Sequence, residues 1–129
     1  MEIIFLTFQE VNLINSNQIN QYGGVYGLRD EKLLDSAINY PQAAFNEKYL
    51  HPNIYRMASA YMYALIKNHP FIDGNKRTGT AAAILFLAFN NVTVMTYNDE
   101  LVDLAITIAE SKINEPEIAQ FLKSKSFTY

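Results

Sequence analysis

His69-Pro70-Phe71-Ile72-Asp73-Gly74-Asn75-Lys76-Arg77 runs almost directly into an apolar segment, Ala81 to Phe89, and these residues govern the expected architecture. The spacing predicts a helix from about Asn75 to Asn90 whose centre is apolar on every side. A helix of that kind belongs in the middle of a bundle, so we expect the other elements to pack around it. The loop before it places a glycine at the entrance of a helix, which makes it the first candidate for a functional site.

Two helices are expected near the start of the chain. Thr7 and Glu10 have the spacing of a capping box, and the helix that they open should end at Gly23-Gly24. Asp30 is a suitable N-cap for a second helix, which Pro41 should end. The apolar stripe of this second helix consists of Leu33, Leu34, Ala37 and Ile38.

Residues 46–52 are predicted to form a loop, in which Tyr49 and Leu50 make a short, exposed, extended segment. A third helix should run from about Asn53 to Lys67, with one apolar face formed by Ile54, Met57, Ala58, Tyr61 and Leu65. Beyond the central helix, residues 91–96 are rich in β-branched side chains and are expected to be extended.

Two more helices are expected in the last third of the chain. Asn98 is predicted to cap a fifth helix, and Asn114 with Glu117 a sixth. The buried stripe of the fifth helix is expected to consist of Leu101, Leu104, Ala105 and Ile108. No alternating set of strands is evident. We therefore predict an all-α protein, a compact bundle of about six helices, with residues 1–129 forming one domain.

Composition excludes several classes of protein. Half of the 129 residues are apolar and 18% are charged, as in folded globular proteins. Without cysteine the chain forms no disulfide and no thiolate metal site. A net charge of −3 argues against direct nucleic-acid binding. The first residues lack the pattern of a signal peptide, and no apolar run approaches the ~20 residues of a membrane span, so a cytoplasmic protein is expected.

The loop before the central helix combines three kinds of chemistry. The amides at a helix N-terminus and a flexible Gly74 can hold an anion, and Lys76 and Arg77 are unfavourable at that positive end without one. Asp73 is a carboxylate of the kind that holds Mg²⁺ beside phosphates. His69 is a candidate general base. The same residues also fit simple helix capping with solvated cations, and residue chemistry by itself leaves both interpretations open.

The stretch His69 to Thr78 resembles the signature of the Fic/Doc family in its Doc form, because Lys76 stands where most Fic proteins have a second glycine. Similarity extends to Tyr22-Gly23-Gly24, to Gly27-Leu28-Arg29-Asp30 and to residues 41–45, so it covers most of the chain. The resemblance implies a compact helical Fic/Doc fold with a short flap loop. It also implies ATP and Mg²⁺ as cofactors.

The resemblance assigns roles to individual residues. His69 would be the catalytic base, Asp73 would hold Mg²⁺, and Phe71 would anchor the loop as a structural residue. The phosphate- and nucleotide-binding set would comprise Gly74, Asn75, Lys76, Arg77 and Lys67. Lys67 stands where an arginine is expected, and its single ammonium does not offer the bidentate fork of a guanidinium. The flap that docks a target segment would lie at residues 46–52, with Tyr49, Leu50 and His51.

Lys76 bears on which reaction the resemblance implies. Fic enzymes transfer AMP to a protein hydroxyl, whereas the Doc form is a protein kinase. The implied activity is therefore an ATP- and Mg²⁺-dependent kinase toxin that modifies a threonine of a translation factor such as elongation factor Tu and halts translation. Its implied partner is a Phd-like antitoxin, because neither Thr96 to Leu101 nor Ser111 to Pro116 completes the inhibitory pattern found in other Fic proteins. Two alternatives stay open, a protein adenylyltransferase and a non-catalytic module that only binds an antitoxin.

Overall fold

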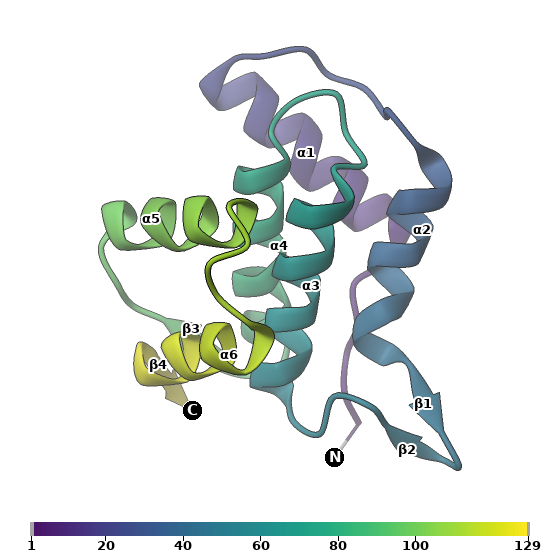
Figure 1. Cartoon of the computed structure of the whole chain (residues 1–129), viewed down its shortest axis with the longest axis vertical. Helices are drawn as coiled ribbons and strands as arrows, with labels where there is room; N and C mark the ends of the chain where they lie inside the picture. Colours follow the sequence, from purple (N-terminus) through teal and green to yellow (C-terminus); the bar gives the residue numbers. More distant parts are fainter. Residues whose placement is uncertain (1, 129) are drawn as a thin grey trace.

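Six α-helices carry the fold in the computed structural model, which describes residues 2–128 (Figure 1). Small strand pairs and one 3₁₀ turn complete the described part of the chain, so the expected all-α bundle is confirmed. The helices are α1 (Phe8–Tyr22), α2 (Glu31–Asn39), α3 (Ile54–Asn68), α4 (Asn75–Phe89), α5 (Asn98–Ala109) and α6 (Glu115–Ser124).

Side chains cap the N-termini of most of the helices. The Thr7 hydroxyl accepts from the Glu10 amide at 3.1 Å, and the Glu10 carboxylate accepts from the Thr7 amide at 2.8 Å, which is the predicted capping box. Asp30 and Asn114 cap α2 and α6 as predicted. The prediction for α5 is wrong by one residue, because Tyr97 is the N-cap and Asn98 is the first helical residue. Glu100 folds back onto the Tyr97 amide there, so the cap is made from within the helix.

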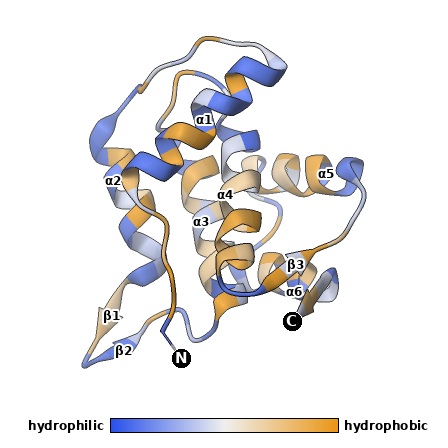
Figure 2. Cartoon of the chain, turned by 180° about the vertical axis from the view of Figure 1, so that it is seen from behind, coloured by the Kyte–Doolittle hydropathy of each residue, from blue (hydrophilic) through white to orange (hydrophobic). Residues whose placement is uncertain are grey.

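The helix at the centre of the bundle is α3, not α4, and this corrects the expectation from the apolar run. Nine residues of α3 are buried against seven of α4. The reason is that α3 packs against α2, α4, α5 and α6, whereas α4 leaves Ala88 exposed and Leu85 half-buried. Figure 2 shows the apolar residues of both helices gathered in the middle of the molecule.

Pro41 ends α2 as predicted, and the chain continues through the 3₁₀ turn η1 (Tyr40–Gln42) into a small hairpin. Strands β1 (Ala44–Phe45) and β2 (Lys48–Tyr49) pair antiparallel around Asn46 and Glu47, which both have positive φ. That geometry belongs to the tight turns that join two strands in a hairpin. The expected extended segment is therefore present at Tyr49, whereas Leu50 lies just outside the strand.

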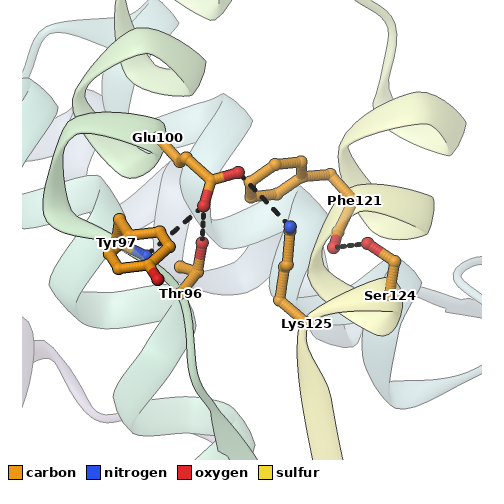
Figure 3. A network of polar contacts seen from close by, with 6 residues as sticks. All are labelled: Thr96, Tyr97, Glu100, Phe121, Ser124 and Lys125. Atoms are coloured by element: carbon orange, nitrogen blue, oxygen red, sulfur yellow. Dashed lines mark hydrogen bonds and ion pairs between the residues drawn. The ribbon is translucent and has the colours of Figure 1, made fainter.

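A second strand pair closes the C-terminal half. Strand β3 (Val92–Val94) falls within the segment predicted to be extended, and it pairs antiparallel with β4 (Ser126–Thr128). Glu100 accepts from the Thr96 hydroxyl at 2.8 Å and lies 3.3 Å from the Lys125 ammonium (Figure 3). The hydrogen bond from Thr96 lowers the pKa of Glu100, and Lys125 lowers it further. These contacts tie the start of α5 to the end of α6.

The two ends of α3 carry different features (Figure 1). Its N-terminal end follows the β1–β2 hairpin, and its C-terminal end leads into the loop 69–74 that enters α4. Because a helix rises about 1.5 Å per residue, 15 residues place these ends roughly 22 Å apart. None of the helices within residues 2–128 has the length and apolarity needed to cross a membrane.

Candidate functional site

The loop between α3 and α4 begins with a left-handed residue. His69 caps α3 with φ 52° and ψ 54°, a conformation that a residue with a Cβ seldom adopts, and its side chain lies in an exposed position. Pro70 and Phe71 then turn into the protein, and Phe71 is fully buried. The buried ring thus anchors the loop while His69 stays accessible to solvent.

Asn75 holds the inner side of the loop. Its side-chain Oδ1 accepts from the Phe71 amide and its Nδ2 donates to the Phe71 carbonyl, both at 2.9 Å. The residue is 5% exposed, so both bonds are shielded from water. The Asn75 side chain is therefore committed to the loop, which leaves only its backbone amide to face an anion.

The segment Gly23 to Asp30 lies along the outer side of the loop. The Ile72 amide donates to the Gly27 carbonyl at 2.9 Å, and Leu28 forms an isolated antiparallel bridge with Phe71. The Arg29 guanidinium donates to the His69 carbonyl at 2.6 Å and to the Asn68 carbonyl at 3.0 Å. This N-terminal segment therefore pairs with the loop through backbone and side chain.

Asp73 is held by two elements at once. Its carboxylate Oδ2 accepts from the Val25 amide at 2.8 Å, and its carbonyl accepts from the Asn15 side chain at 2.9 Å. Gly24 makes the approach possible, because a Cβ there would lie 3.2 Å from the Asp73 Cβ. The carboxylate is half-buried, so it is oriented by the protein and remains open to a ligand.

Gly74 has a packing role beside the one expected from the sequence. Its φ of +78° requires glycine, and an added Cβ would meet Ile19 at 3.2 Å and Asn15 at 3.3 Å. The close approach that the glycine permits is therefore to α1. As the N-cap of α4 it also carries no side chain to cover the first amides of the helix.

The two cations of the loop, Lys76 and Arg77, lie on the first turn of α4 and both are exposed. The Arg77 guanidinium lies 4.8 Å from the centre of the Tyr22 ring, which belongs to the last residue of α1. Lys67 is different: its ammonium donates to the Ser111 hydroxyl, in the connection between α5 and α6. Among the residues expected to bind phosphate, Gly74 to Arg77 are contiguous and Lys67 is engaged elsewhere.

The structure separates the three expected flap residues from the loop. Tyr49 and Leu50 lie at the hairpin and are exposed, at the far end of α3 from His69 (Figure 1). His51 is only 6% exposed, and its ring contacts Tyr40 edge-on with centroids 4.6 Å apart. The segment that lies against the loop is Gly23 to Asp30, because it, and not the hairpin, supplies the backbone pairing described above.

A cleft of about 360 Å³ lies beside the hairpin between α3 and α6. Tyr40, His51, Arg56 and Glu115 are among its lining residues. Burial lowers the pKa of His51, against an opposing effect of Glu115. Burial and the hydrogen bond to Glu115 raise the pKa of Tyr40 to about 12. The residues that line the cleft include none from the loop at 69–77, so the cleft is distinct from the loop.

Two residues that organise the loop carry no local signal of that role in the sequence. Asn15 is fully buried in α1 and also donates to the Thr78 hydroxyl at 3.1 Å. In the sequence it is one of several asparagines in a weakly periodic helix. Arg29 stands inside a stretch that resembles the family, but the resemblance assigned it no role. Only the pairing of distant segments reveals both contacts.

Comparison with known proteins finds similarity to one family. The model of the Fic/DOC family matches residues 5–87. "Toxin Doc" of Mycolicibacterium smegmatis is 37% identical over 94 residues, which cover 73% of this chain and 68% of that protein. "Protein kinase doc" of Escherichia phage P1 is 30% identical over 115 residues, which cover 89% of this chain and 90% of that protein. The chain belongs to the Fic/DOC family.

Proposed function

We propose that this protein is the toxin of a toxin–antitoxin pair and acts as a protein kinase that transfers the γ-phosphoryl group of ATP to a protein hydroxyl. The observation that carries the proposal is the contiguous loop His69 to Arg77, which presents an exposed imidazole, an oriented carboxylate and two exposed cations at an uncapped helix N-terminus. Two relatives named as a Doc toxin and a Doc kinase support it.

His69 is proposed as the general base. Histidine exchanges protons near neutral pH and suits the removal of a hydroxyl proton from the acceptor residue. The left-handed backbone puts this residue at the open end of α3, and the buried Phe71 fixes the chain two residues later. The backbone of His69 is thereby fixed, while its imidazole ring stays available to an incoming hydroxyl.

The residues present fit a magnesium nucleotide. Mg²⁺ typically takes one or two carboxylates, and the donor chemistry of Asp73 meets that need with an oxygen already oriented by Val25. The α4 amides after Gly74, together with Lys76 and Arg77, would bind the phosphates. When bound, the magnesium nucleotide supplies the transferable phosphoryl group and neutralises charge that develops on it.

Lys76 favours a kinase over an adenylyltransferase in this proposal. Its side chain is exposed on the first turn of α4, where a glycine would leave room for the α- and β-phosphates of a nucleotide that donates AMP. A cationic side chain in that place narrows the room and favours a nucleotide that presents its γ-phosphate. AMP transfer is the second candidate, because the rest of the loop would serve either orientation.

The protein substrate is proposed to approach over the segment Gly23 to Leu28 and the loop. Four exposed apolar side chains belong to these elements, namely Val25, Tyr26, Leu28 and Ile72. An apolar surface beside a proposed active site suits the docking of a polypeptide. The hairpin at Tyr49 and Leu50 remains a second candidate for target contacts, but it lies at the other end of α3. The proposed target is a threonine of elongation factor Tu, and a Phd-like antitoxin is the proposed inhibitor.

The test compares ATP labelled on the γ-phosphate with ATP labelled on the α-phosphate. Purified protein, Mg²⁺, elongation factor Tu and a cell extract would be incubated with each, and His69→Ala would be the control. Transfer from the γ position only, lost in the control, is the expected result. Transfer from the α position only would establish AMP transfer. No transfer from either would favour a non-catalytic module that binds an antitoxin.

A further inference from the structure

We infer that Arg29 is a positioning residue for His69: its guanidinium holds the C-terminal end of α3 so that the imidazole is presented in one orientation. The inference rests on the proposed function, because His69 is the proposed base. Arg29 lies 40 positions before His69 in the sequence, and the contact exists only in the folded chain.

Four hydrogen bonds make this contact. The Arg29 side chain donates from Nε to the His69 carbonyl at 2.6 Å and from Nη2 to the Asn68 carbonyl at 3.0 Å. The backbone amides of Arg29 and Asp30 both donate to the Pro70 carbonyl, at 2.7 and 3.0 Å. Three consecutive carbonyls, of residues 68 to 70, are thus fixed by one short segment.

The carbonyls at the end of a helix have no partner within the helix and carry partial negative charge. Glycine commonly occupies the left-handed position there, because a Cβ makes that conformation unfavourable. Here the position holds a histidine with φ 52°. A cationic fork that bonds two of these carbonyls offsets the unfavourable backbone and restrains the residue that carries the imidazole.

The arginine guanidinium has the shape needed to bond two neighbouring carbonyls, and a lysine side chain does not. Arginine presents several donors in one plane, whereas lysine presents a single ammonium on a flexible stem. Asp30 shares the segment, but its side chain is committed to the cap of α2, where it accepts from Leu33 at 3.1 Å. The restraint on the His69 carbonyl therefore comes from the Arg29 guanidinium.

The experiment uses the full chain with Arg29→Lys and Arg29→Gln. Arg56→Lys is the matched control, because Arg56 lies on the first turns of α3, far from His69. The chain has two histidines, so the imidazole signals of His69 can be followed by NMR with His51 as an internal reference. Transfer kinetics would be measured in parallel, with kcat and KM for ATP determined separately.

Both Arg29 variants are expected to shift or broaden the His69 signals and leave those of His51 unchanged. We expect kcat to fall by about 100-fold, the loss that a misplaced catalytic group typically causes, with little change in KM for ATP. The Arg56 control should leave the His69 signals and kcat as in the parent and should move only the signals of His51, because Arg56 and His51 line the same cleft. Unchanged His69 signals and kcat in the Arg29 variants would overturn the inference. So would equal disturbance of both histidines with a lowered Tm, which would make Arg29 merely structural. If the parent transfers no label while the Arg29 variants still move only the His69 signals, the proposed function fails and the positioning contact stands.

Discussion

Replacing Asn75 by alanine tests the most enclosed part of the loop. Asn75 satisfies both the amide and the carbonyl of Phe71 at 2.9 Å, and Phe71 is fully buried. The variant would leave one buried donor and one buried acceptor without partners. Each such group costs about 1–3 kcal/mol, so the free energy of unfolding should fall by about 2–6 kcal/mol. That is a large part of the roughly 5–15 kcal/mol that stabilises a domain.

The assay is urea denaturation followed by circular dichroism, with Asn39→Ala as the matched control. Asn39 is exposed at the end of α2, where its side chain donates to the Asp35 carbonyl at 3.0 Å, so its loss should cost no more than about 0.5 kcal/mol. Asn75→Asp refines the test, because a carboxylate still accepts from the Phe71 amide but has no donor for its carbonyl. Protonation of the carboxylate restores a donor, so the free energy of unfolding of Asn75→Asp should rise relative to that of Asn75→Ala as the pH falls toward about 4. A loss below about 1 kcal/mol in Asn75→Ala would refute the reasoning.

Three further predictions concern a titratable group and two proposed ligands. Burial lowers the pKa of His51 in the folded chain, so the unfolded chain binds a proton there more readily. The contribution of His51 to the free energy of unfolding should therefore be complete above about pH 7. It should fall as the pH drops below about 6.5, by at most about 1.4 kcal/mol per pH unit. His51→Gln should flatten the urea-derived profile between pH 7 and 5, and an unchanged slope would contradict this. Asp73→Asn keeps the acceptor for Val25 and should therefore fold normally, while the Mg²⁺ concentration needed for half-maximal transfer rises at least tenfold; an unaltered Mg²⁺ dependence would remove Asp73 from the proposed site. Lys76→Gly should reduce γ-phosphoryl transfer and open a route to AMP transfer, measured with the two labelled nucleotides, and undiminished γ transfer would show that Lys76 does not set the orientation.

The features that the sequence predicts correctly are local. A cap needs only residues a turn apart, as with Thr7 and Glu10, and a break needs only Pro41. The error at α5 is of the same local kind, because Asn98 and Tyr97 are adjacent and Glu100 stands at the third helical position only when Tyr97 is the N-cap. The loop with its histidine, carboxylate and cations is one continuous stretch, so the sequence alone is enough to propose it as a site.

What the sequence leaves out depends on distant contacts. The apolar run in α4 marked it as the central helix, but burial depends on the number of neighbours, and α3 has more of them. The pairing of β3 with β4 joins residues more than 30 positions apart. Asn15 and Arg29 act on a loop that lies 40 or more positions away, and no local pattern marks them. The expected flap fell at the hairpin because sequence order does not tell which connection meets the loop.

The measurement that tests the central claim most directly is the mass of the modified acceptor. Purified elongation factor Tu would be incubated with ATP, Mg²⁺ and either the parent protein or His69→Ala, and its peptides analysed by mass spectrometry. The proposal predicts one threonine that gains the mass of a phosphoryl group with the parent and remains unmodified with the variant. A gain equal to an AMP group would contradict the kinase assignment, and phosphorylation that persists with His69→Ala would contradict the role of His69.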